Sequence, residues 1–569
     1  MNRRLGLGFL VIVAGALVLR CPQLDRRPMH NDEAVNALKI QGLWERGVYA
    51  YDPDEYHGPA LYYATLPFVW LSPARDFDHL SEKTLRLAPV FFGVTLILLL
   101  WLLRDGLGWP AALSAGALTA ISPAMVFYSR YFIHEMLLVC FTFVLLVAGW
   151  RYARAPHLGW ALLGGTGLGL MSATKETFVI ALGAMAVAAM VTAFWAHRSD
   201  PADRAVRSLW NPKHALAGLG AATVIWVVLF TSFFTHASGL LDSLRSFVPW
   251  LHRAAGHSPH IHPFTYYFQH LIAFHQGKGP VWSEGLILFL AGVGTVSAFT
   301  RKGLAWPECA RPRAQQDPQT DQGPNTGAHV AGGSLLRPGT GALRRQCPGT
   351  HGLAQPSVWL FRFIAIYTTV LALAYCMISY KTPWCMLGFL HGLILLAGLG
   401  AVVFVQFWKF PSLRIASGIV LVAASVQLVW QAWRASFEFA ADGRNPYVYA
   451  QTVPDILKLE QKVEAIAKAN PKGERMVIQV MAPDGDYWPL PWYLRRFKQV
   501  GWWDKSPAEP NSPVMIVGAK FEAALDEKSN KAWIMAGLFE LRPRIYFELY
   551  VEASLWSRYV ENLPKPREE

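Results

Sequence analysis

The fold is decided by stretches such as LRLAPVFFGVTLILLLWLL, residues 85–103, in which one Arg interrupts an otherwise apolar run. An α-helix needs about 20 apolar residues to cross a bilayer, so this run predicts a membrane span. The sequence therefore predicts a mainly α protein, a polytopic transmembrane helical bundle of about 11 spans. The other apolar runs are Leu5–Leu19, Pro110–Tyr128, Met136–Trp150, Leu158–Ala173, Thr177–Trp195, Ala215–Phe234, Val281–Phe299, Val358–Ser379, Trp384–Phe407 and Ile415–Trp433.

The composition supports a membrane protein. Hydrophobic residues make up 53% of the 569-residue chain and charged residues 16%. Soluble domains carry about 25% charged residues, so this composition excludes an ordinary soluble protein, and its apolar content excludes a disordered one. The net charge of +13 has a membrane explanation, because Lys and Arg are retained in cytoplasmic loops. Since no zinc-finger spacing or basic heptad region accompanies this charge, we expect no nucleic-acid partner.

The short basic loops alternate along the predicted spans. Such loops mark the cytoplasmic side, which predicts a cytoplasmic N-terminus and, with an odd number of spans, an extracytoplasmic C-terminus. We therefore expect a multi-pass protein of the cell (inner) membrane. The segments that would share the outer face are 20–84, 129–135, 174–176, 235–280, 380–383 and everything after Arg434.

Two regions differ from the bundle, which we assign to residues 1–435. Residues 301–357 are rich in Gly, Pro, Gln, Thr and Arg without hydrophobic periodicity, which predicts a flexible cytoplasmic insertion. Residues 436–569 alternate two kinds of pattern, which predicts a small soluble α/β domain on the extracytoplasmic side. Its strand-like runs are 476–481 and 514–517, and its helix-like stretches are 453–469 and 521–536.

The first outer loop contains His30-Asn31-Asp32-Glu33, followed by a helix-like stretch. Asn31 is a favourable N-cap, which places Asp32 and Glu33 in the first helical turn, where the helix dipole favours ionised carboxylates. An ionised carboxylate at the mouth of a bundle can act as a general base, so both acids are candidate catalytic residues. The alternative is that both are ordinary first-turn acids on a surface helix.

A second motif in the same loop carries a family resemblance. His57-Gly58-Pro59-Ala60-Leu61 follows the Asp-Glu pair by about 25 residues, the spacing of a loop that folds back on the membrane. An Asp-Glu pair followed by His-x-Pro-x-Leu resembles the GT-C glycosyltransferases. The chain is most similar to the protein O-mannosyltransferase and aminoarabinose transferase group, and within it to a branch labelled flippase-activity-associated. The wider group usually has His-Pro-Pro-Leu, from which this motif departs.

Further charged residues lie at the outer ends of the predicted spans. The family has an Arg and an acidic residue that face its cavity, and Arg130 and Glu135 resemble these two. Lys381 lies in a segment that resembles the family's Lys-x-Pro-Trp motif. Charges at the membrane boundary are costly and usually face a polar cavity or each other. Lys175 and Glu176 have an equal alternative, a structural ion pair or snorkelling. The candidate substrate-binding residues are His57, Arg130, His134, Glu135, Lys175, Glu176 and Lys381.

The resemblance implies transfer of a sugar from a polyprenyl-phosphate donor, held among membrane lipids, to a protein, lipid or glycan acceptor on the extracytoplasmic face. Asp32 would take the proton of the acceptor hydroxyl, and Arg130 and Lys381 would neutralise the leaving phosphate. No cofactor follows from the sequence. The histidines between residues 236 and 279 lack an HExxH frame, so we assign no metal ligand, and the need for a divalent metal stays open.

Two other functions compete with the transferase. A polytopic bundle with polar residues could be a transporter or flippase of lipid-linked sugar. The sequence shows no inverted repeat, however, and its candidate charges gather at one face rather than at the midplane. The other alternative is a non-catalytic envelope scaffold, because a transferase fold does not by itself establish activity.

Overall fold

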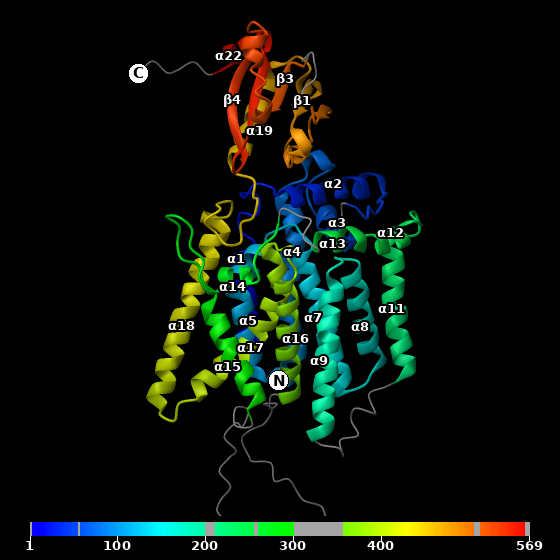
Figure 1. Cartoon of the computed structure of the whole chain (residues 1–569), viewed down its shortest axis with the longest axis vertical. Coiled ribbons are helices and arrows are strands. Elements are labelled where there is room, and N and C mark those ends of the chain that lie inside the picture. Colours follow the sequence, from blue (N-terminus) through cyan, green and yellow to red (C-terminus); the bar gives the residue numbers. More distant parts are fainter. Residues whose placement is uncertain are drawn as a thin grey trace, which may run out of the picture.

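The computed structural model describes residues 3–54, 57–199, 211–254, 260–300, 357–505 and 512–563. Figure 1 shows a bundle of long helices with a small sheet at one end. The predicted insertion at 301–357 lies, apart from Ser357, outside the described residues.

Each apolar run predicted as a span is helical. Within the described residues, seven helices are long and apolar enough to cross a membrane, or eight if the pair α5 and α6, bent by 60°, forms one span. Three more, α1, α8 and α15, are apolar but shorter. The polytopic helical bundle is thus confirmed. The helices are α1 (Arg3–Arg20), α4 (Glu82–Leu107), α5 (Trp109–Ile121), α6 (Pro123–Ser129), α7 (Glu135–Arg154), α8 (Leu158–Ser172), α9 (Phe178–Ser199), α11 (Pro212–Phe230), α15 (Gly285–Phe299), α16 (Val358–Met377), α17 (Leu387–Gln406) and α18 (Pro411–Trp433).

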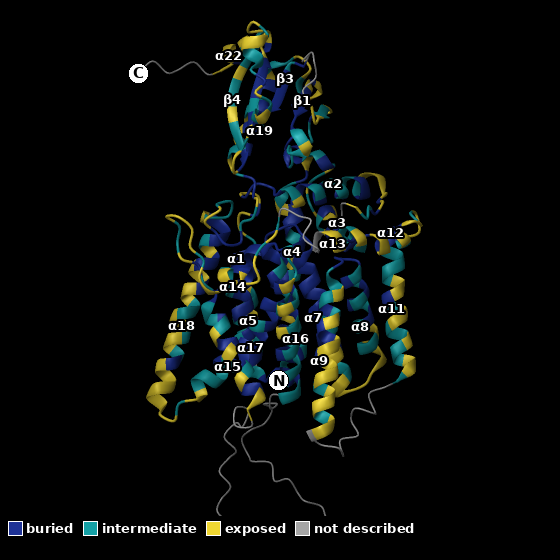
Figure 2. Cartoon of the chain, viewed as in Figure 1, coloured by how far each residue is buried: buried dark blue, intermediate teal, exposed yellow. Residues whose placement is uncertain are grey.

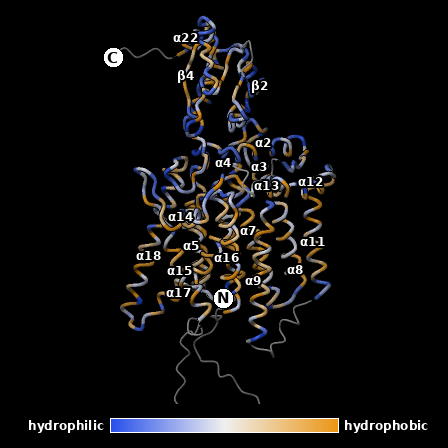
Figure 3. The backbone as a smooth tube through the Cα atoms, in the orientation of Figure 1, coloured by the Kyte–Doolittle hydropathy of each residue, from blue (hydrophilic) through white to orange (hydrophobic). Residues whose placement is uncertain are grey.

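The helices at the sides of the bundle expose apolar surface. In the most apolar window of α11 and of α18 only 11% of residues are buried, whereas 61% are buried in that of α7 (Figure 2). Figure 3 shows hydrophobic residues along the full height of the bundle. Such a surface would be costly in water and is satisfied by lipid, since the helical backbone already pairs its own polar groups.

Shorter helices gather at the end of the bundle that carries the sheet (Figure 1). The segments predicted to share one face therefore meet at one end of the molecule. These helices are α2 (Asn31–Arg46), α3 (Ala60–Trp70), α12 (Gly239–Arg245), α13 (Phe247–Ala254) and α14 (Tyr266–Ile272).

The start of α2 differs from the expectation by one residue. His30, not Asn31, is the N-cap, and its Nδ1 accepts the backbone N–H of Asp32 at 3.1 Å. Glu33 in turn accepts the backbone N–H of His30 at 3.0 Å. This reciprocal capping box satisfies two amide groups at the helix start, which a cap at Asn31 would not do.

The C-terminal region forms a five-stranded sheet in the order β2-β1-β3-β5-β4. β1 pairs in parallel with β2 and β3, and β5 is antiparallel to β3 and β4. The predicted strands at 476–481 and 514–517 and the helix at 453–469 are confirmed. The elements are α19 (Asp455–Ala469), β1 (Val477–Met481), α20 (Leu490–Tyr493), β2 (Gln499–Trp503), β3 (Val514–Gly518), α21 (Leu525–Lys528), β4 (Trp533–Arg542), β5 (Ile545–Glu552) and α22 (Ala553–Glu561).

The helix predicted at 521–536 is wrong. Only the short α21 forms there, and the chain then enters β4. Asn530 and Lys531 adopt φ angles of 50° and 64°, which a right-handed helix does not allow. The helix-forming residues before them cannot extend past this turn.

The sheet region is fastened to the bundle by α20. The Tyr493 hydroxyl accepts the backbone N–H of Met29 at 2.8 Å, and Trp492 Nε1 donates to Glu82 Oε1 at 2.7 Å. Met29 directly precedes the cap of α2. The C-terminal region therefore buttresses the loop that carries the Asp-Glu pair.

Candidate active site

A polar cavity of about 170 Å³ opens at the end of the bundle nearest the sheet region. Its lining comes from α2, from α13, from the start of α7 and the residues just before it, and from the segments that precede α3, follow α8 and connect α16 to α17. Five of the predicted site residues reach it: Asp32, His57, His134, Glu135 and Lys175. Its other lining residues are Val35, Asn36, Ile133, Trp250, Tyr380 and Trp384.

Asp32 presents a carboxylate to this cavity. Its side chain is 52% exposed, and its nearest basic group is His30 Nδ1, 3.8 Å from Oδ1. His30 is in turn held by the carbonyl of Tyr449, which lies 3.1 Å from Nε2. Because Nδ1 accepts the Asp32 amide, His30 carries its proton on Nε2 and donates it to Tyr449. Asp32 is thus fixed at its backbone while its carboxylate remains accessible.

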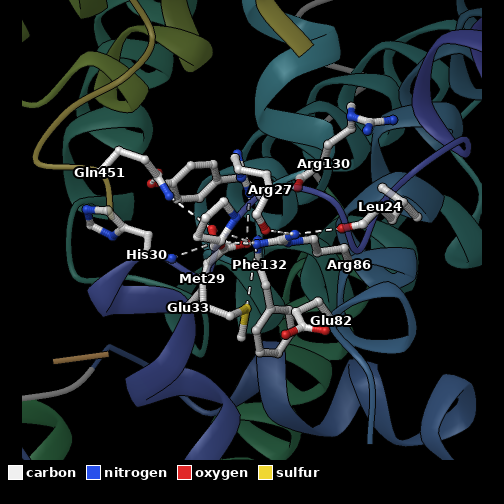
Figure 4. A network of polar contacts seen from close by, with 12 residues as sticks. Leu24, Arg27, Met29, His30, Glu33, Glu82, Arg86, Arg130, Phe132 and Gln451 are labelled. Carbon is white, nitrogen blue, oxygen red and sulfur yellow. Dashed lines mark hydrogen bonds and ion pairs between the residues drawn. The ribbon is translucent and has the colours of Figure 1, made fainter. Parts of the chain in front are cut away.

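Glu33 has a different environment from its neighbour, because it is fully buried (Figure 4). Oε1 accepts from Arg27 at 2.9 Å and Oε2 from Arg86 at 2.8 Å. The backbone N–H of Phe132 also donates to Oε1 at 2.9 Å. Burial by itself would raise the pKa of Glu33, but the two guanidiniums outweigh it and hold the pKa at about 2. Glu33 ties the loop before α2 to α4, and it does not line the cavity.

The glycine of the second motif positions His57. The N–H of Gly58 donates to the Thr174 carbonyl at 3.1 Å, and the N–H of Ala60 donates to the Ala173 carbonyl at 2.8 Å. A Cβ added at Gly58 would lie 2.3 Å from the Ala173 oxygen. The departure from His-Pro-Pro therefore has a physical reason: proline has no N–H for Thr174, and any side chain would collide with this strand-like contact.

This contact places His57 against Glu176. Nδ1 of His57 lies 2.8 Å from Oε2 of Glu176, and the Tyr51 hydroxyl donates to Oε1 at 3.3 Å. Burial raises the pKa of Glu176. The His57 ring also stacks on Trp250, with 4.8 Å between ring centroids and an 18° tilt. His57 is therefore held on two sides at the wall of the cavity.

Lys175 and Glu135 form a buried ion pair on the same wall. Burial lowers the pKa of Lys175, but Glu135 outweighs burial, so the pKa lies above its ordinary value. Beside them, the pKa of His134 is well below its ordinary value, through burial and then repulsion from His57 and Lys175. Within the described residues, Lys175 is the only Lys or Arg that lines the cavity.

Arg130 and Lys381, the predicted phosphate contacts, do not line the cavity. The Arg130 guanidinium donates to the carbonyls of Arg20 at 2.8 Å and Pro22 at 2.7 Å. Lys381 Nζ donates to the carbonyl of His262 at 3.0 Å and to that of Ile378. Both side chains thus donate to backbone carbonyls at helix ends or in loops. The structure thus brings five of the predicted residues together and separates these two and Glu33 from them.

Sequence reasoning missed the aromatic wall and the positioning histidine. Trp250, Tyr380 and Trp384 line the cavity, and His30 holds Asp32. Tyr380 and Trp384 flank Lys381 in the motif already singled out, which was the available signal. Trp250 lies on α13, and no motif marked it as a site residue.

The described residues contain no group of three His, Cys, Asp or Glu side chains arranged to hold a metal ion. Of the acids around the cavity, Glu135 is bound to Lys175 and Glu176 contacts His57. This donor set does not fit a divalent metal, which needs several free oxygen ligands.

A second, apolar groove of about 380 Å³ runs between α8, α9 and α11 and passes under α12 and α13. Most of its lining is apolar, for example Leu182, Leu219 and Phe247. It ends at Glu176, whose carboxylate contacts His57 of the polar cavity. The two hollows thus adjoin through the Glu176–His57 contact.

Comparison with known proteins agrees with this architecture. The family model of dolichyl-phosphate-mannose-protein mannosyltransferases matches residues 76–229. A sequence comparison with curated proteins found no match.

Solved structures match over nearly the whole chain. ArnT from Cupriavidus metallidurans, bound to undecaprenyl phosphate, is 14% identical, with 96% of this chain and 98% of that chain covered and a TM-score of 0.59. Its apo state is 15% identical over the same shares, with a TM-score of 0.57. The oligosaccharyltransferase AglB from Archaeoglobus fulgidus, in complex with an inhibitory peptide and a dolichol-phosphate, is 12% identical, with 91% of this chain and 70% of that chain covered and a TM-score of 0.53. The chain is therefore a multi-pass membrane protein with the fold of the GT-C glycosyltransferases.

Proposed function

We propose that the protein transfers a sugar from a polyprenyl-phosphate donor to a hydroxyl acceptor at the end of the bundle that carries the sheet region. The observation that carries this proposal is the meeting of an apolar groove and a polar cavity at Glu176 and His57. A lipid-linked sugar has the same two parts, an apolar chain and a polar head. Undecaprenyl phosphate and dolichol-phosphate, the lipids bound to ArnT and AglB, have this chemistry.

Each part of the donor has a matching place in the structure. The isoprenoid chain would lie between α8, α9 and α11, and the sugar phosphate would enter the cavity past Glu176. Lys175, rather than Arg130 or Lys381, would stabilise the phosphate as negative charge develops on it, because it is the one of the three that lines the cavity. The aromatic wall of Trp250, Tyr380 and Trp384 offers flat apolar faces to the sugar ring.

The reaction balances with the residues present. Asp32 accepts the proton of the acceptor hydroxyl, the acceptor oxygen forms a bond to the anomeric carbon of the sugar, and the bond from that carbon to the phosphate oxygen breaks. The polyprenyl phosphate leaves with the bonding electron pair. The acceptor reaches the Asp32 carboxylate from the exposed side of the cavity, which would be the extracytoplasmic side.

Reconstitution separates this function from its rivals. The purified full chain is placed in liposomes with a polyprenyl-phosphate sugar. Mass spectrometry follows conversion of the lipid-linked sugar into free polyprenyl phosphate, and oxidation of the sugar by external periodate follows its movement between the leaflets. A transferase converts the first into the second when an acceptor is present. Movement of the unchanged lipid across the bilayer would indicate a flippase, and no change in either measurement would indicate a scaffold; both outcomes contradict the proposal.

A further inference from the structure

A small pocket of about 10 Å³ is lined by three arginines, Arg27, Arg86 and Arg130. Figure 4 labels all three. This volume accommodates about one atom-sized occupant, a water molecule or a monatomic ion, and excludes a phosphate. The pocket joins the loop after α1, α4, α6 and the π-helical turn η3 (Arg434–Glu438), through which the chain leaves the bundle. Its lining residues are Leu24, Arg27, Arg86, Phe127, Arg130 and Ser436.

The positive charge around this pocket exceeds the negative charge. Arg27, Arg86 and Arg130 are 8%, 1% and 6% exposed. Among the described residues, Glu33 is the one carboxylate with which these guanidiniums form an ion pair, and Arg130 forms none. Buried charges without counter-charges cost several kcal/mol each.

Neighbouring groups do not restore the balance. Arg20, fully buried on the other side of Arg130, adds a further positive charge. Burial raises the pKa of the Cys21 thiol, which therefore stays neutral. Glu82, on the first turn of α4, adds one negative charge near Arg86, so these four arginines still outnumber the two carboxylates. Burial and then repulsion from Arg27 and Arg86 lower the pKa of Arg130 to about 9.

Two hydrogen-bond donors at this pocket have no protein partner. Among the described residues, neither Arg27 Nε nor Ser436 Oγ has a hydrogen-bond partner, and both side chains are more than nine-tenths buried. Buried donors are nearly always satisfied, so each orphan atom points to an occupant that accepts hydrogen bonds. Two donors within a ring of guanidiniums suit an anion better than water, because water would leave the charge unchanged.

We propose that this pocket is a binding site for a monatomic anion of the chloride type. The ion accepts from Arg27 Nε and Ser436 Oγ and supplies the counter-charge that Glu33 alone does not provide. It thereby links the loop that carries Asp32 to the turn η3. No bond is made or broken, so the role is structural and does not depend on the transferase reaction.

Thermal unfolding of the full chain in detergent tests the site. Chloride is titrated against gluconate at constant ionic strength, because gluconate is too large for the pocket. We expect the Tm of the wild type to rise by about 2–3 °C and to saturate, with bromide giving the same effect. A Tm that does not depend on chloride overturns the proposal.

Matched variants locate the effect. Ser436→Ala and Arg27→Lys should lose most of the chloride dependence, whereas Ser557→Ala, on exposed α22, and Arg434→Lys, beside the pocket but outside it, should keep it. Equal chloride dependence in all four variants overturns the assignment to this pocket. If Ser436→Ala does not fold, crystals of the wild type grown with bromide decide the question. An anomalous peak beside Arg27 Nε supports the site, and a peak without anomalous signal shows water and overturns it.

Discussion

Nδ1 of His57 lies 2.8 Å from Oε2 of Glu176, and this contact stands where the apolar groove meets the polar cavity. The two residues come from loops 119 positions apart in the sequence. Their contact exists because the backbone of Gly58 pairs with that of Thr174. The junction between the apolar groove and the polar cavity is therefore set by a backbone contact, which brings the two side chains together.

Gly58 is the position at which this arrangement is most easily broken. Gly58→Ala places a Cβ 2.3 Å from the Ala173 oxygen, so the loop must move and the His57–Glu176 contact must lengthen. We expect a loss of turnover of at least about tenfold, since small misplacements of site residues cost this much or more. The measurement is donor consumption by the reconstituted variant. Gly443→Ala, with open space at the Cβ position and no positive φ, controls for a general loss of glycine.

Glu33→Gln should act on stability rather than on chemistry. The change removes the charge that compensates buried Arg27 and Arg86, and breaking such a pair costs about 3–5 kcal/mol. Denaturant unfolding of the purified protein measures this loss. Glu45→Gln, on the last turn of the same helix, is the control. A variant with wild-type stability and lost turnover would instead make Glu33 the general base.

The same residue predicts a pH dependence of stability. The folded-state pKa of Glu33 is about 2, against an ordinary value of 4.5. A depressed pKa contributes stability that is fully present above about pH 4.5 and is lost as the pH falls towards 2. We expect Tm to fall steeply in this window in the wild type and to be flatter there in Glu33→Gln. Equal slopes in the two proteins would contradict the buried ion network.

Substitutions of Lys175 and of Lys381 should have different effects, the first on donor binding and the second on stability. Lys175 lines the cavity, so the double variant Glu135→Gln/Lys175→Gln, which leaves no unpaired charge, should raise KM for the lipid donor and lower kcat. Lys381→Gln removes a donor to the His262 and Ile378 carbonyls and should lower Tm while KM stays unchanged. Steady-state kinetics with varied donor and thermal unfolding measure the two effects. The reverse pattern would return the phosphate contact to Lys381.

The helices of the bundle could be predicted from the sequence, but which charged side chains at their ends face the cavity could not. Each apolar run became a helix because lipid leaves the backbone no alternative. Arg130 and Glu135 both follow the third predicted span, yet Glu135 lines the cavity and Arg130 binds carbonyls of the loop after α1. This choice depends on contacts with residues more than 100 positions away, which periodicity does not encode.

The N-cap predicted at Asn31 and the helix predicted at 521–536 were wrong for more local reasons. His30, not Asn31, is the N-cap because Glu33 lies three residues after His30 and completes the reciprocal capping box with it. The stretch 521–536 has helix-forming residues, but the positive φ angles at Asn530 and Lys531 end α21 and begin β4. Asp32 is exposed and Glu33 is buried. This difference also depends on α4, because Arg86 of that helix forms an ion pair with Glu33.

The general base is the central claim, and Asp32→Asn tests it most directly. Asparagine keeps the size of the side chain, and the capping contact from the Asp32 backbone to His30 is unaffected. We predict an unchanged Tm and a loss of turnover of lipid-linked sugar of at least about a hundredfold. Asp54→Asn, exposed in the same loop, should retain full turnover. Near wild-type turnover by Asp32→Asn would contradict the account and leave Glu135 as the next candidate.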